Sequence, residues 1–150
     1  MTCQDNELLL NNVLIQMARS FLQYVAESSP WVSYDTASLE SQVLVLAARQ
    51  RQDVAELATL LTNREHFIDF GSFPTEYTDQ QFLSLQSIIG RIEASHALVC
   101  RRIETAGESL RTAGDAVGSE TLVQVLHFER DIQRGLSEIR TALSAVPVVR

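Results

Sequence analysis

The sequence contains no lysine: all twelve of its basic side chains, among 150 residues, are arginines. A P-loop nucleotide site, a Schiff-base aldolase and a pyridoxal-phosphate enzyme each need a lysine amine, so these three classes are excluded. The basic residues are also outnumbered by nineteen acids, which gives a formal net charge of −7. Because a sequence-independent nucleic-acid binder needs a basic patch to displace counterions, we expect no nucleic-acid role.

Cysteine and long apolar runs are also scarce. Two cysteines, Cys3 and Cys100, are too few for a disulfide framework and lack the CxxC spacing of a zinc site, which fits a reducing compartment. No apolar run approaches the roughly 18 residues of a membrane-spanning helix, and the first thirty residues lack the basic segment that opens a signal peptide. We therefore expect a cytoplasmic protein with no membrane segment and, from its length, a single domain over residues 1–150.

Apolar residues recur with the 3.6-residue period of an amphipathic helix in four segments, and strand-like alternation is never sustained. The segments cover about residues 6–27, 36–63, 79–105 and 119–143. All three prolines lie outside them. We expect Thr78 to cap the third helix with Gln81 as its partner in a capping box, and Ser119 to begin the fourth. The sequence thus predicts an all-α bundle of four helices.

The connections predict the topology. Residues 28–35 form a short link, which makes the first two helices antiparallel neighbours. Residues 64–78 form a longer connection that spans about 50 Å when extended, whereas a helix of about 26 residues is about 39 Å long. This segment can therefore run the length of the bundle and begin the third helix parallel to the second. Four apolar side chains would then lie along the outside: Phe67, Ile68, Phe70 and Phe73.

Four long helices with a crossover between the second and third resemble the ferritin-like superfamily, and the chain is similar to small bacterial ferritin-like proteins of unassigned function. Two local features carry the second resemblance: Gln23-Tyr24 followed by Pro30-Trp31, and residues 71–79 before the third helix. The resemblance implies a ferritin-like four-helix bundle with a long crossover between helices 2 and 3. In active members it implies two irons, bound by a glutamate from each of two helices and a Glu-x-x-His from each of the other two.

Mapped onto this chain, that ligand pattern is largely missing. The first helix has Met17 at its central inward position, the second has Gln50, and the fourth has Glu129 without a histidine on the same face. Only the third helix, with Glu93-Ala-Ser-His96, keeps the spacing in which a carboxylate and an imidazole share one helix face. The di-iron site that the resemblance implies is therefore degenerate.

Five polar residues are expected to meet in one layer across the middle of the bundle. Gln50, His96 and Glu129 lie inside the apolar stripes of their helices, and Asp53 and Glu93 lie at the stripe edges. A buried carboxylate without partners is costly, so two interpretations remain. In the first, Glu129 accepts hydrogen bonds from protonated His96 or from the Gln50 amide, and the layer fixes the register of the helices. In the second, Glu93, His96, Glu129 and Asp53 form a reduced site for iron or manganese.

A second apolar row, Leu8, Ile15 and Leu22, lies roughly opposite the core stripe of the first helix. A surface helix needs only one apolar face, so either the crossover covers part of this row or the row is the seam of a homodimer. Two functions follow. The first is a non-catalytic bundle without a cofactor, acting by self-association, as an expected homodimer, or by binding a protein partner. The second is a metal-dependent oxidase or iron-handling protein. The missing ligand on the first helix favours the non-catalytic function.

Overall fold

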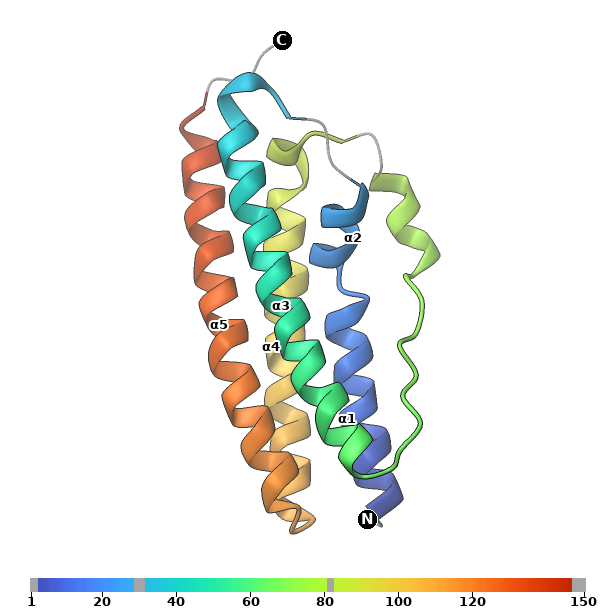
Figure 1. Ribbon diagram of the computed structural model, residues 1–150. Coiled ribbons are helices and arrows are strands. Elements are labelled where there is room, and N and C mark those ends of the chain that lie inside the picture. Colours follow the sequence, from blue (N-terminus) through green and yellow to red (C-terminus); the bar gives the residue numbers. More distant parts are fainter. Residues whose placement is uncertain (1–2, 29–31, 81–82, 147–150) are drawn as a thin grey trace.

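The computed structural model describes residues 3–28, 32–80 and 83–146. Within these ranges the chain forms five α-helices, two short 3-10 helices and no strand. The α-helices are α1 (Cys3–Ala18), α2 (Phe21–Ser28), α3 (Ala37–Asn63), α4 (Leu85–Thr112) and α5 (Ala116–Ser144), and the 3-10 helices are Tyr34–Thr36 and Thr75–Gln80. Because α2 continues the direction of α1, the result is an all-α bundle of four helical columns, as predicted (Figure 1). None of the helices in the described ranges is long and apolar enough to cross a membrane.

The connection between α3 and α4 runs along the outside of the bundle, beside α1 and α2 (Figure 1). It returns the chain to the end where α3 began, so α4 runs parallel to α3, as the loop length predicted. The Asn11 side chain of α1 holds this crossover by donating to the Asp69 carbonyl at 2.8 Å and accepting from the Asp69 N–H at 3.0 Å. Arg19 adds hydrogen bonds to the carbonyls of Phe70 and Gly71, both at 3.1 Å.

The first helical column is broken between α1 and α2, whereas the sequence predicted one helix over residues 6–27. Ser20 stands at the break, where its hydroxyl accepts a hydrogen bond from the Gln23 N–H at 3.3 Å. A serine in this position caps a new helix because it satisfies one of the free N–H groups of the first turn. The same hydroxyl donates to Gln50 Oε1 at 2.7 Å. A tertiary contact therefore compensates for the interruption of the helix.

The second apolar row, Leu8, Ile15 and Leu22, does not form one exposed face. Leu22 is buried in the core and is not part of an outer face. Ile15 is half-buried under the crossover, which comes so close at Gly71 that a Cβ there would lie 2.7 Å from Ile15 Cγ2. Only Leu8 is largely exposed, at 49%. The crossover thus covers part of the row, as one of the two interpretations expected, and the prediction that Leu22 lies on an outer face is wrong.

α4 begins later than predicted. Its N-cap is Ser84, whose hydroxyl accepts from the Ser87 N–H, and Thr78 lies instead in the 3-10 helix that precedes it. The Thr78 hydroxyl donates to a carbonyl within that short helix, which occupies it locally. Gln81, the expected capping partner, lies outside the described residues, as do Pro30 and Trp31.

α5 begins earlier than the predicted Ser119. Asp115 caps it by accepting a hydrogen bond from the Gly118 N–H at 2.9 Å. The same carboxylate accepts two hydrogen bonds from Arg64, at 2.7 and 2.8 Å, and these hold the pKa of Asp115 below its usual range. The pair ties the end of α3 to the start of α5.

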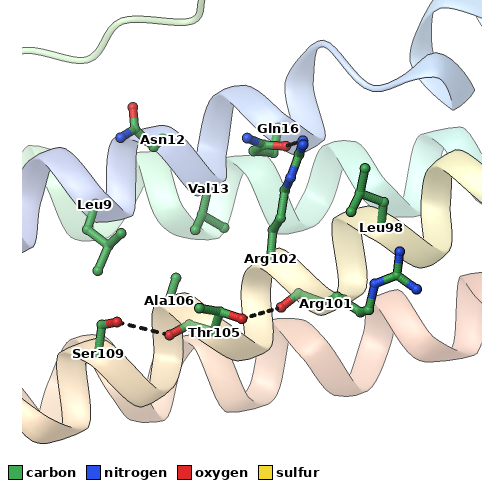
Figure 2. A pocket seen from close by; sticks show the side chains of 10 residues that line it. All are labelled: Leu9, Asn12, Val13, Gln16, Leu98, Arg101, Arg102, Thr105, Ala106 and Ser109. Atoms are coloured by element: carbon green, nitrogen blue, oxygen red, sulfur yellow. Dashed lines mark hydrogen bonds between the residues drawn. The ribbon is translucent and has the colours of Figure 1, made fainter.

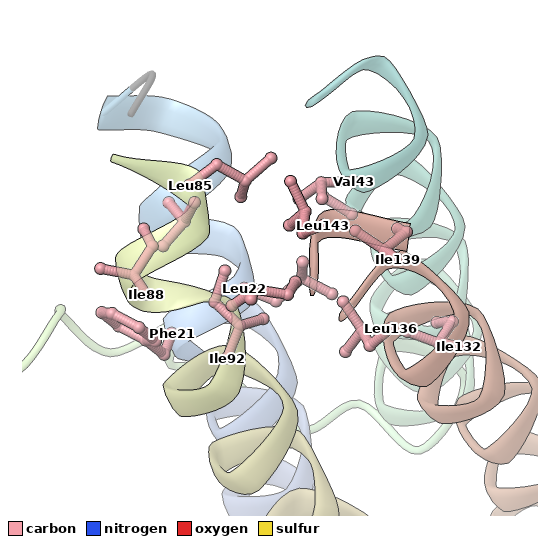
Figure 3. Close-up of a cluster of buried hydrophobic side chains, with 13 residues drawn as sticks. Phe21, Leu22, Val43, Leu85, Ile88, Ile92, Ile132, Leu136, Ile139 and Leu143 are labelled. Atoms are coloured by element: carbon pink, nitrogen blue, oxygen red, sulfur yellow. The ribbon is translucent and has the colours of Figure 1, made fainter. Parts of the chain in front are cut away.

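Two apolar cores fill the bundle, one on each side of its middle. The upper core, at the α2 end of Figure 1 and enlarged in Figure 3, consists of Phe21, Leu22, Val25, Val43, Ala47, Leu85, Ile88, Ile89, Ile92, Ile132, Leu136, Ile139 and Leu143. The lower core consists of Leu10, Val13, Leu14, Met17, Leu57, Leu61, Val99, Ile103, Ala106, Leu110, Leu122 and Val125. Both cores draw on α3, α4 and α5, while α2 serves only the upper core and α1 only the lower core.

Candidate functional site

A layer of polar side chains crosses the bundle between the two cores. The polar layer consists of Gln23 from α2, Gln50 and Asp53 from α3, His96 from α4 and Glu129 from α5, and none of them is more than 3% exposed. The predicted meeting of Gln50, His96 and Glu129 is therefore confirmed. Asp53 lies inside the layer, although the sequence placed it at the edge of its stripe.

Glu129 is the centre of the polar layer. Its Oε1 accepts a hydrogen bond from Gln50 Nε2 at 2.7 Å and lies 3.3 Å from His96 Nε2. Burial opposes ionisation, but hydrogen bonds from His96, Asp53 and Gln50 outweigh it and bring the pKa of Glu129 below its usual range. Both partners considered for Glu129 from the sequence are thus engaged at once.

His96 is held as an imidazolium cation by acceptors on both sides. Its Nε2 faces the Glu129 carboxylate, and its Nδ1 lies 2.6 Å from Oε1 of Gln133. The Gln133 amide is oriented by its own Nε2, which donates to the Glu93 carbonyl at 3.2 Å. Because neither acceptor has a proton to give, both ring nitrogens donate. Burial opposes the charge, but hydrogen bonds to Cys100 and Glu129 raise the pKa of His96 to about 10.

Asp53 and Glu129 bring two carboxyl groups together in the dry interior. Asp53 Oδ2 and Glu129 Oε2 are both buried, and neither has a donor other than the opposing carboxyl group among the described residues. Burial and the neighbouring Glu129 raise the pKa of Asp53 to about 8, although Arg49, 3.3 Å from Oδ1, opposes the shift. Two carboxyl groups share a hydrogen bond only when one is protonated. The proton belongs to Asp53, which donates to Glu129 at neutral pH.

On the α2 side, the hydrogen bonds of the polar layer include three side chains that the sequence analysis did not assign to it: Ser20, Gln23 and Arg51. Gln50 Oε1 accepts from Ser20 Oγ at 2.7 Å and from Gln23 Nε2 at 2.9 Å, and Gln23 Oε1 accepts from Arg51 at 3.1 Å. Gln23 could have been found as the one polar residue in the apolar stretch Phe21–Ala26. Hydrogen bonds therefore run without a gap from Arg51 to Glu129.

Gln133 completes the layer on the α4 side, where it links His96 to the α4 backbone. It lies four residues after Glu129, and this spacing places both side chains on one face of α5. A search of the sequence for polar residues one turn from Glu129 would have found it. The hydrogen-bonded network thus ends at Arg51 on one side and at Gln133 on the other, and the apolar stripes of the helices predicted neither residue.

Glu93 does not join the polar layer. Its carboxylate accepts a hydrogen bond from Ser137 at 2.8 Å and forms an ion pair with Arg140. Of the four residues proposed as ligands, the structure brings Asp53, His96 and Glu129 together and leaves Glu93 apart. Among the described residues, no group of three or more His, Cys, Asp or Glu side chains is arranged to hold a metal ion.

Several hollows lie on the outside of the bundle. The α1–α4 groove has a volume of about 490 Å³ and lies between those two helices (Figure 2). The α3–α5 hollow, about 330 Å³, is lined by apolar side chains such as Val45, Leu46 and Ile139. No residue of the polar layer lines either hollow.

Fold and site together define an all-α four-helix bundle whose central layer carries a protonated carboxyl group, a carboxylate and an imidazolium cation. No family model, curated protein or solved structure matches the chain. The resemblance to ferritin-like proteins therefore stays a prediction from the sequence.

Proposed function

We propose that this protein is a non-catalytic bundle of the ferritin-like kind, without an intact di-iron site, which acts by self-association or by binding a protein partner. The observation that supports this is the closure of the polar layer. Gln50, His96 and Glu129 are buried, and Gln50 and His96 are both hydrogen-bonded to Glu129. None of the three lines the α1–α4 groove or the α3–α5 hollow. A catalytic site needs a concave surface that a substrate can enter. The layer is better suited to fixing the register of the helices.

One observation favours the alternative function, a metal-dependent oxidase or an iron-handling protein. Asp53 Oδ2 and Glu129 Oε2 are buried oxygens without another donor, and His96 is adjacent. An ion of iron or manganese bound there would need both carboxyl groups ionised and a neutral imidazole. The hydrogen bonds around His96 and the proton on Asp53 favour the opposite charge state, so this alternative is the weaker one.

Metal analysis and two substitutions at Glu129 separate these functions. Glu129→Gln keeps an acceptor for its neighbours, so we expect an intact fold and a loss of about 1–3 kcal/mol in the free energy of unfolding. Glu129→Ala leaves the His96 cation without its carboxylate and should cost about 3–5 kcal/mol. Urea unfolding followed by circular dichroism measures both losses. Iron or manganese that co-purifies with the wild type and is lost from Glu129→Ala would overturn the proposal.

We place the self-association surface on the outer face of α3 and α5. Val45 is 67% exposed there, and Arg49, one turn further along α3, lies 4.0 Å from the centre of the Phe128 ring of α5, which is 41% exposed. The first helix, from which a homodimer seam was expected, offers only Leu8 as a largely exposed member of its row. The α3–α5 face is therefore the stronger candidate for contact with a second copy.

Sedimentation velocity on three forms of the protein tests this surface. We expect a wild-type dimer at tens of micromolar, at least tenfold weaker association for Val45→Glu, and unchanged association for Leu8→Glu, a matched apolar-to-acid change on α1. A monomeric wild type would remove self-association and leave only binding to a protein partner. Dissociation by Leu8→Glu alone would move the seam to the first helix.

A further inference from the structure

The α1–α4 groove has an apolar wall along most of its length and a cationic end. Leu9 and Val13 of α1 face Ala106 of α4 across it, and the groove is open to solvent (Figure 2). Arg101 and Arg102 lie toward the end that is nearer Leu98. A volume of about 490 Å³ is within the range of sites for small organic molecules.

The two arginines lack the anionic partners that most other arginines have. Arg102 donates to the neutral Gln16 side chain at 2.5 Å, and the Arg101 guanidinium makes no hydrogen bond, ion pair or ring contact with any residue in the described ranges. No acidic residue lines the groove, although the chain as a whole carries a charge of −7. By contrast, five arginines of the described chain pair with carboxylates: Arg64, Arg111, Arg130, Arg134 and Arg140.

A second, smaller hollow extends this cationic end. It measures about 240 Å³, shares Gln16, Leu98 and Arg102 with the groove, and adds Arg19 beneath the crossover. Its lining also contains no acid. An anion at the junction of the two hollows would therefore meet guanidinium groups without a competing carboxylate.

The dimensions favour a small ligand over a protein segment. From Arg102 to Ser109, α4 rises about 10 Å, a length that an extended alkyl chain of roughly eight carbons covers. The whole groove, from Leu98 to Ser109, follows only about 16 Å of α4. A stable protein interface buries about 800 Å² on each partner, which needs a longer surface than this.

We propose that the α1–α4 groove binds a medium-chain carboxylate, with its alkyl tail on Leu9, Val13 and Ala106 and its carboxylate on Arg101 and Arg102. The carboxylate replaces the neutral Gln16 as the partner of Arg102, because a charge-assisted pair is stronger than a hydrogen bond to an amide. This site is separate from the α3–α5 face, so the failure of either proposal leaves the other standing.

Calorimetric titration with sodium decanoate, well below the concentration at which it forms micelles, tests the proposal. We expect the wild type to bind decanoate with a submillimolar dissociation constant, and to bind neither acetate, which lacks the tail, nor decyltrimethylammonium, which carries the opposite charge. Amide chemical shifts should change at Val13 and Ala106. No binding of decanoate up to 1 mM, or equal binding of the cationic amphiphile, would overturn the proposal.

A pair of double variants with the same net charge separates contact from long-range attraction. Arg101→Gln with Arg102→Gln should weaken decanoate binding at least tenfold. Arg111→Gln with Arg134→Gln removes two charges from exposed pairs that do not line the groove, and should bind decanoate as the wild type does. All four side chains are exposed, so circular dichroism should show the same fold in both variants. Equal affinity in the two double variants would contradict the assignment of the carboxylate to Arg101 and Arg102.

Discussion

At the scale of single residues, the position of one proton determines the chemistry of the polar layer. With the proton on Asp53, Glu129 is the only carboxylate of the layer, and its charge is balanced by the His96 cation. A buried ion pair with satisfied hydrogen bonds is tolerated in a protein interior, whereas two adjacent carboxylates are not. Asp53 thus acts as a neutral donor, in the way that an amide would.

This assignment predicts how stability depends on pH. The pKa of Asp53 is about 8 in the folded protein, against an ordinary value of 3.8. Between these values the folded state binds more protons than the unfolded state, so the contribution of Asp53 to stability is full below about pH 4 and is lost as the pH rises through 8. The slope for one proton is at most about 1.4 kcal/mol per pH unit. Asp53→Asn supplies the same donor without titrating, and should flatten the profile.

Urea unfolding between pH 4.5 and 5.5 measures the effect of Asp53→Asn, since a histidine with the ordinary pKa of 6.5 stays mostly protonated there in the unfolded chain. The wild type should lose stability relative to Asp53→Asn as the pH rises, and should be the less stable of the two at pH 7. Asp131→Asn, at an exposed carboxylate paired with Arg134, is the control and should run parallel to the wild type. Parallel profiles for Asp53→Asn and the wild type would place the proton elsewhere.

Helix periodicity predicted part of this site and could not predict the rest. Gln50, His96 and Glu129 interrupt apolar stripes, so their burial follows from position alone. The place of Glu93 depends on Ser137 and Arg140, which compete for its carboxylate and lie on another helix. Hydrogen bonds between helices depend on the relative positions of the residues along the bundle axis. The apolar pattern of a single helix does not contain that information.

At the scale of elements, the sequence predicted the long helices and the crossover better than the ends of the helices. Loop length was enough to predict the parallel course of α3 and α4. No proline or glycine marks the break before α2 in the sequence. The break depends on Ser20, which caps α2 and also donates a hydrogen bond to Gln50. Tertiary contacts thus decided a boundary that local propensity left open.

The crossover itself depends on Gly71, and a substitution there tests this. Gly71 has φ +68°, and a Cβ would lie 2.7 Å from Ile15 Cγ2 of α1. Gly71→Ala should therefore cost about 1–3 kcal/mol in the free energy of unfolding. Gly90→Ala, inside α4 with no neighbouring atom within 4 Å, should instead gain up to about 1 kcal/mol. A neutral Gly71→Ala in thermal or urea unfolding would mean that the crossover does not hold this contact with α1 in solution.

At the scale of the whole molecule, the polar layer lies where the upper and lower cores meet. Each core is apolar and draws on several helices, so each has the composition of a small folding unit. α3, α4 and α5 pass through both cores without interruption (Figure 1). The layer also links all four columns by hydrogen bonds, and a buried hydrogen-bonded network favours one arrangement of its helices. We therefore expect the two cores to unfold as one cooperative unit.

Matched deletions in the two cores test this cooperativity. Leu57 of the lower core and Leu136 of the upper core are both fully buried, so Leu57→Ala and Leu136→Ala should each cost about 2–5 kcal/mol. Native-state hydrogen exchange reports the stability of each core separately, through its slowest amides. If the layer couples the cores, either deletion lowers protection in both cores by the same amount. If protection is lost only in the core that carries the deletion, the two cores open independently. The polar layer is then a boundary between them, and the three continuous helices do not couple their stabilities.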